Sequence, residues 1–128
     1  MFTSYWASPK LREMERKGEA YIVQISNSRP KGYGEVRVRE KMWEAVPEWR
    51  IVEKSKRDGD HDFYTREYLA ALEGRRREIL KALTALHGRT EGRKIVLCCY
   101  EKPANFCHRH LFADYCNQKF EGIRSEEL

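Results

Sequence analysis

The chain has 128 residues, of which 41% are hydrophobic and 12% aromatic, so it can bury a core without the help of a metal or a disulfide. The net charge of +5 favours anionic partners, without distinguishing nucleotides from nucleic acids or acidic proteins. All apolar runs are far shorter than the roughly 18 residues that cross a bilayer, and the first ten residues do not look like a secretory signal, so we expect no membrane association.

The first half of the chain predicts two strands. Phe2–Ala7 is a short run of aromatic and β-branched residues, and Leu11–Lys17 fits a helical turn or two. Ala20–Ile25 is almost continuously apolar, which is typical of a strand covered on both faces, and a polar, turn-rich loop follows over residues 26–32. Residues 33–60 give no clear assignment; the candidates for core packing there are Trp43, Val46 and Trp49.

The second half predicts two helices, a strand and a last helix. Apolar residues recur at helical spacing at Tyr64, Tyr68, Leu72, Ile79, Leu83 and Leu86. Gly74 divides this pattern into two helices, and Gly88 ends it. Lys94–Tyr100 is predicted to be a buried strand, and Cys107–Lys119 a helix with Asn105 as its N-cap.

Strands separated by helices predict the α/β class. We expect one domain over residues 1–128, with three layers and a mainly parallel sheet flanked by helices, similar to Rossmann or flavodoxin architectures. In such sheets, ligands bind beyond the carboxyl ends of the strands.

The segment Leu97–Leu111 holds three of the four cysteines and two of the four histidines. Side chains alternate along a strand, so Cys99 and Glu101 are expected on the same face at its carboxyl end. On the following helix, His108 points with the apolar stripe toward the sheet, and Arg109 lies at the edge of that stripe. A polar side chain directed inward at the start of a helix needs a partner, which could be a carboxylate, a backbone carbonyl or a ligand.

These positions suggest chemical roles. Cys107 lies at the start of the helix beside a histidine and an arginine, and is a candidate nucleophile or ligand contact. His108 and Glu101 are candidates for acid–base or orienting roles, although a structural pairing competes with this interpretation. Arg109 has the planar fork and the position of an anion-binding residue.

The other cysteines have simpler interpretations. Cys98 and Cys116 are expected to be packing thiols, because free cysteine behaves as a small buried hydrophobic residue. Cys99 is either another packing thiol or a contact to a ligand, and a slip of one residue in the strand would exchange it with Cys98. Free thiols suit a reducing compartment, so we expect a cytoplasmic protein.

A zinc site is an alternative to these roles. The right types of ligand are present in Cys99, Cys107, His108 and His110. However, no CxxC pair occurs and the two histidines project from different sides of the helix, so no metal is expected. GxxxxGK and GxGxxG loops are also missing, so no cofactor is predicted. His61, in a charged loop, is interpreted as simply exposed.

The segments "LCCYEKP" and "FCHRHLFADY" resemble the carboxyl-terminal signature of the bacterial and phage proteins grouped as domain of unknown function 488. The amino-terminal "TSYWA" and "VQISNSRPKG" are similar to its shorter members. The residues that match the signature are Leu97, Cys98 or Cys99, Glu101, Cys107, His108 and Arg109. The resemblance implies an α/β fold with a polar cluster at the carboxyl end of the sheet, and it implies no particular reaction.

If Tyr21–Ile25 and Ile95–Tyr100 are parallel neighbours, the loop after the first of them meets the Cys-His-Arg segment. The predicted ligand contacts are Ser26, Ser28 and Arg29 from that loop, together with Cys99 from the end of the second strand.

The leading hypothesis is an enzyme acting on a nucleotide or another phosphate- or carboxylate-bearing small molecule. The second is a non-catalytic module that binds nucleic acid or nucleotides, aided by basic residues at 54–57 and 75–77. The third is a buried polar network that only stabilises the strand–helix junction.

Overall fold

Five parallel strands form a single sheet in the computed structural model, which describes residues 1–28, 32, 34–100 and 105–128. The strands are β1 (Phe2–Tyr5), β2 (Ala20–Gln24), β3 (Val38–Lys41), β4 (Lys94–Cys99) and β5 (Glu126–Glu127). Their order across the sheet is β3-β2-β4-β1-β5, and every pairing is parallel. The predicted α/β class with a parallel sheet is therefore confirmed.

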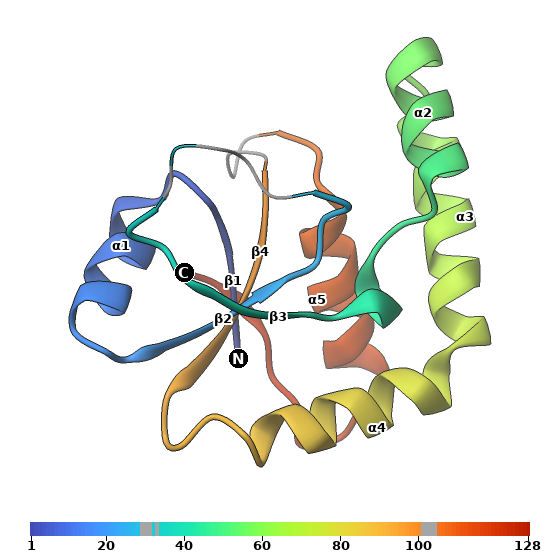
Figure 1. Cartoon of the computed structure of the whole chain (residues 1–128). Helices are drawn as coiled ribbons and strands as arrows, with labels where there is room; N and C mark the ends of the chain where they lie inside the picture. The colour runs from blue at the N-terminus through green and yellow to red at the C-terminus, as the bar shows by residue number, and fades with distance from the viewer. Residues whose placement is uncertain (29–31, 33, 101–104) are drawn as a thin grey trace.

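Helices cover both faces of this sheet unequally (Figure 1). They are α1 (Pro9–Arg16), α2 (Trp49–Asp58), α3 (His61–Gly74), α4 (Arg76–His87) and α5 (His108–Lys119), with a 3-10 turn at Trp43–Ala45. Helix α1 packs on one face, while α3, α4 and α5 pack on the other, and α2 stands with α3 at the side of the molecule (Figure 1). The fold is thus a three-layer arrangement with a thin layer and a thick layer around the sheet.

Strand β4 lies at the centre of the sheet and separates two core clusters. Its side chains alternate as predicted: Ile95, Leu97 and Cys99 pack in the larger cluster under α3–α5, while Val96 and Cys98 pack in the smaller cluster under α1. Strands β2 and β4 are parallel neighbours, which was the condition for the predicted meeting of their loops, and Tyr21 lies beside Ile95 in register. Because β2 and β4 run parallel, the segments that follow them emerge at the same end of the sheet.

The unassigned region 33–60 contains β3, the 3-10 turn and α2. Strand β3 is a half-buried edge strand with the sequence VREK, so it lacks an apolar pattern. The expectation that both tryptophans pack in the core was wrong, because Trp43 is 66% exposed and Trp49 is 57% exposed. Val46, by contrast, is buried.

The ends of two helices differ from those predicted from the sequence. The division at Gly74 is confirmed, but α3 begins earlier than the apolar pattern, at His61, because the Asp60 carboxylate accepts a hydrogen bond from the Phe63 N–H. Helix α5 has Cys107 rather than Asn105 as its N-cap residue, so that expectation was wrong. Among the described residues, none of the helices is long and apolar enough to cross a membrane.

Candidate functional site

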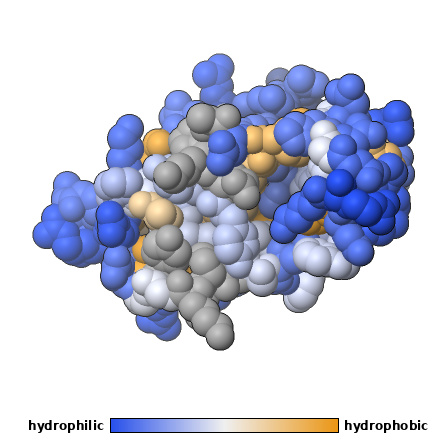
Figure 2. All heavy atoms as spheres, turned by 90° about the horizontal axis from the view of Figure 1, so that it is seen from above, coloured by the Kyte–Doolittle hydropathy of each residue, from blue (hydrophilic) through white to orange (hydrophobic). Residues whose placement is uncertain are grey.

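A cavity of about 850 Å³ lies at the carboxyl ends of β2 and β4, bounded on its outer side by α2 and α3. Figure 2 looks onto this end of the molecule, where hydrophilic side chains over α2 and α3 border a hollow with apolar side chains inside it. Five predicted site residues line the cavity: Ser26, Ser28, Cys99, Cys107 and His108. The structure therefore brings together the loop after β2 and the strand–helix junction after β4. Arg29 and Glu101 lie outside the described residues.

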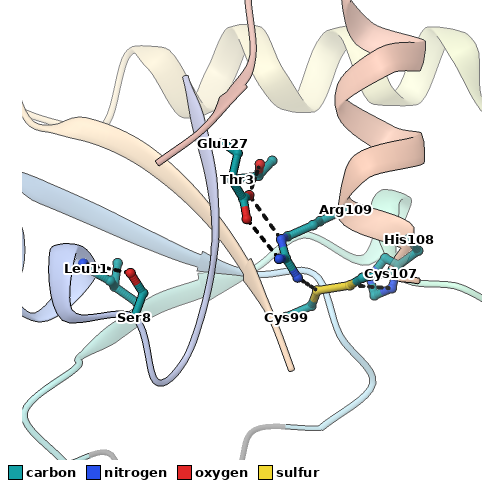
Figure 3. A network of polar contacts seen from close by, with 8 residues as sticks. All are labelled: Thr3, Ser8, Leu11, Cys99, Cys107, His108, Arg109 and Glu127. Carbon is teal, nitrogen blue, oxygen red and sulfur yellow. Dashed lines mark hydrogen bonds and ion pairs between the residues drawn. A yellow bond between two sulfur atoms is a disulfide. The ribbon is translucent and has the colours of Figure 1, made fainter. Parts of the chain in front are cut away.

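Cys99 and Cys107 form a disulfide that joins the end of β4 to the N-cap of α5 (Figure 3). Both cysteines were expected near the carboxyl end of the sheet, as thiols or ligand contacts, so this disulfide was not predicted. Both side chains are buried although they contribute to the cavity wall. Cys98 and Cys116 are free, buried thiols, and burial raises the pKa of Cys116 to about 12, which is the behaviour of packing residues.

His108 begins α5 and is directed inward, as its helical position predicted. Its Nε2 lies within hydrogen-bonding distance of the Ile25 carbonyl oxygen. A carbonyl only accepts, so Nε2 must carry the hydrogen, and in a neutral ring Nδ1 then carries the lone pair. Burial lowers the pKa of His108 to about 4, which keeps the ring neutral near pH 7. The Nδ1 atom lies 4.0 Å from the Cys107 sulfur.

Arg109 has a side chain with no exposed surface, and it is not among the described residues that line the cavity. Its Nε and Nη2 donate to the two carboxylate oxygens of Glu127 at 3.1 and 2.9 Å, and its Nη1 donates to the Cys99 sulfur at 3.2 Å (Figure 3). Glu127 also accepts a hydrogen bond from the Thr3 hydroxyl at 2.7 Å. The guanidinium thus connects β5, β1 and the disulfide from beneath the cavity, and its predicted role as a ligand contact stays a prediction.

Aromatic residues that the sequence analysis missed form the outer wall of the cavity. His61 is stacked on Phe106 with ring centroids 4.2 Å apart and an interplanar angle of 9°, and Tyr64 meets Phe106 edge-on. Trp49 and Lys56 line the same cavity from α2. His61 is exposed, as predicted, but it begins α3 rather than lying in a loop, and its ring contacts Phe106. Trp49 and Lys56 are seven residues apart, which places them on the same face of a helix. The sequence could indicate this only if a helix had been predicted at residues 49–58, and none was.

Comparison with known proteins identifies a family. Residues 8–120 match the sequence profile of DUF488-N3a, described as the active DUF488-N3 subclade. The chain belongs to the DUF488 family. No curated protein and no solved structure matches it. The resemblance noted from the Cys-His-Arg segment is thus confirmed, and the matched DUF488 region includes the whole cavity.

Proposed function

We propose that this DUF488 protein binds an anionic small molecule with a planar aromatic part, such as a nucleotide, and acts on it at the floor of the cavity. The observation that carries the proposal is the composition of the cavity wall. Flat rings on the outer side, from Trp49, His61 and Phe106, suit stacking with a base. The Lys56 ammonium group and the Ser28 hydroxyl, which also line the cavity, suit contacts with a phosphate, whereas the Ser26 hydroxyl already donates to the Ser28 carbonyl at 2.7 Å.

The reactive group of the proposal is the Cys107–His108 pair. Two equivalents of a small-molecule thiol reduce the disulfide and leave as a small-molecule disulfide. The Cys107 thiol then faces the lone pair of His108 Nδ1, which can accept its proton. The sulfur can then form a bond to an electrophilic atom of the ligand, and the leaving group departs with the electron pair of the broken bond. The Ile25 carbonyl would orient the histidine in this step.

A small ligand is favoured over a nucleic acid because four of the six basic residues in the clusters at 54–57 and 75–77 already have acidic partners. Lys54 and Arg57 form ion pairs with Asp58, Arg75 forms one with Glu48, and Arg76 forms one with Glu73. Phosphate groups of a nucleic acid would have to compete with these carboxylates. The cavity, by contrast, is open to solvent and has a volume of the size that small-molecule sites have.

Titration calorimetry with a nucleoside monophosphate, the matching nucleoside and inorganic phosphate tests the proposal. Trp49→Ala should weaken nucleotide binding by about 5- to 150-fold, because base–aromatic stacking is worth about 1–3 kcal/mol. Trp43→Ala is the matched control, since Trp43 is as exposed as Trp49 but does not line the cavity. Lys56→Ala and Lys54→Ala form a second pair of the same kind.

Three results would contradict the proposal. One is the absence of binding by all three probes, and another is an equal loss in the Trp43 and Trp49 variants. The third is tight binding of a single-stranded oligonucleotide that weakens steeply with salt, which would favour the nucleic-acid module instead.

A further inference from the structure

The strongest unassigned feature is a group of three metal-binding donors at the cavity floor. The sulfur atoms of Cys99 and Cys107 and a ring nitrogen of His108 all lie within 4.8 Å of one another. They come from the end of β4, the N-cap of α5 and the first residue of α5, so two well-packed elements fix them (Figure 3). Two sulfurs and one imidazole nitrogen form a donor set that zinc prefers.

The surroundings of these donors are those of a metal site. A metal-binding histidine usually donates its other ring N–H to a carbonyl or carboxylate, and His108 Nε2 does so to the Ile25 carbonyl. This leaves Nδ1, the nitrogen on the Cys107 side, with the lone pair that a metal requires. The Cys99 sulfur accepts a hydrogen bond from Arg109 Nη1, which favours a thiolate at that position.

We propose that, when the disulfide is reduced, Cys99, Cys107 and His108 bind one Zn²⁺ through their two sulfurs and Nδ1, with the fourth position open to the cavity. Reduction by two equivalents of a small-molecule thiol yields two cysteine thiols and one small-molecule disulfide. Binding then releases two protons and leaves two thiolates on the ion.

Charge balance favours this site in its buried setting. Two thiolates neutralise the charge of the ion, and the nearby Arg109 guanidinium is ion-paired with Glu127 at 2.9 Å. The sulfurs must separate to about 3.8 Å around a tetrahedral ion with Zn–S bonds of about 2.3 Å. The Cα atoms of the two cysteines are 7.7 Å apart, which is wider than the roughly 4.4–6.8 Å usual for disulfides and leaves that room.

The fourth position explains why the site would matter to the cavity. All three donor residues contribute to its wall, together with Ser26 and Asn105. Water or an anionic oxygen of a ligand can therefore complete the tetrahedron from the cavity side, as at zinc sites that bind substrates. The metal would occupy the sulfur and the lone pair that the thiol step needs, so the two are exclusive states of one centre.

The inference goes beyond the proposed function, and metal binding can be measured without any nucleotide. The reduced full-length protein is titrated with Co²⁺ under anaerobic conditions, and then with Zn²⁺ in competition. We expect one ion per chain and a sulfur-to-cobalt absorption of the strength given by two thiolates. Cys99→Ser, Cys107→Ser and His108→Gln should each weaken binding at least 10-fold.

The chain provides matched controls for all three variants. Cys98→Ser and Cys116→Ser remove buried thiols away from the site, and His110→Gln removes a neighbouring histidine of the same helix. These should bind Co²⁺ as the wild type does. Circular dichroism identifies any variant that fails to fold. A second measurement on the wild type needs no substitution: Zn²⁺ should protect Cys99 and Cys107 of the reduced protein from alkylation, as read by peptide mass spectrometry.

Failure to retain an ion after reduction, a cobalt spectrum without thiolate absorption, or alkylation unaffected by Zn²⁺ would each overturn the metal site. An equal loss of affinity in the control variants would also overturn it. Nucleotide binding to the oxidised, metal-free protein is measured in parallel. If it persists while metal binding fails, only the metal site is refuted, and the reverse pattern refutes only the nucleotide proposal.

Discussion

Replacing Glu127 by alanine should strongly destabilise the protein, because it removes the carboxylate that pairs with a fully buried guanidinium. The Arg109 side chain is 0% exposed, and it donates two hydrogen bonds to Glu127. Breaking a buried ion pair from one side costs about 3–5 kcal/mol. The Glu127 side chain is 26% exposed, so water can reach part of the vacated site, and we expect a smaller loss of about 2–4 kcal/mol.

Urea unfolding of the oxidised protein measures this loss. With an m-value of about 2 kcal/mol/M, a loss of 3 kcal/mol lowers the midpoint by about 1.5 M. Glu126→Ala is the control, since it removes the same charge from the exposed neighbouring residue of β5. The double variant Arg109→Met/Glu127→Ala should be less destabilised than the sum of its single variants.

A Glu127→Ala variant that loses under about 0.5 kcal/mol, or no more than Glu126→Ala, would refute the reasoning. It would mean that Arg109 does not depend on this carboxylate in the folded protein. Strict additivity in the double variant would lead to the same conclusion.

Three further predictions concern the pH dependence of the Glu127 contact and two other hydrogen bonds. Burial alone would raise the pKa of Glu127, but the hydrogen bonds it accepts, led by that from Arg109, outweigh burial and lower it. The carboxylate therefore stabilises the fold above its unfolded pKa of about 4.3, and the stability gap between wild type and Glu127→Gln should shrink as urea unfolding is moved from pH 7 to pH 3. Tyr68→Phe should cost about 1–2 kcal/mol in the same assay, because the buried hydroxyl donates to the Ala45 carbonyl; an unchanged midpoint would contradict this. Ser8→Ala should cost about 0.5–2 kcal/mol through loss of the N-cap of α1, and Ser8→Asp should recover most of it in thermal unfolding.

The structure bears most directly on the hypothesis of a structural role for the strand–helix junction. His108 and Arg109 both belong to a buried polar network, through the Ile25 carbonyl and through Glu127, while Glu101, the third residue of the structural hypothesis, lies outside the described residues. That network lies beneath a cavity, so a structural role and a functional one are compatible at this junction. The stability and binding experiments above separate the two contributions.

The sequence by itself determined the features that depend on local periodicity. The alternation along Lys94–Cys99 assigned Cys98 and Cys99 to opposite faces, and the helical spacing around His108 directed that ring toward the sheet. The Cys-His-Arg signature was sufficient to indicate the family. Each of these conclusions needs only neighbouring residues, because a strand or helix fixes the directions of its own side chains.

Only the tertiary structure decided which distant residues meet. Arg109 forms an ion pair with Glu127, which is 18 residues away on an edge strand, and no pattern in the sequence distinguishes Glu127 from other carboxylates. The bond between Cys99 and Cys107 depends on how α5 returns to the end of β4. The aromatic wall of the cavity depends on α2 and α3 standing beside the sheet, where their packing rather than their own periodicity places Trp49 and His61. Such pairings are set by the order of strands and the packing of helices, and that information is not local in the chain.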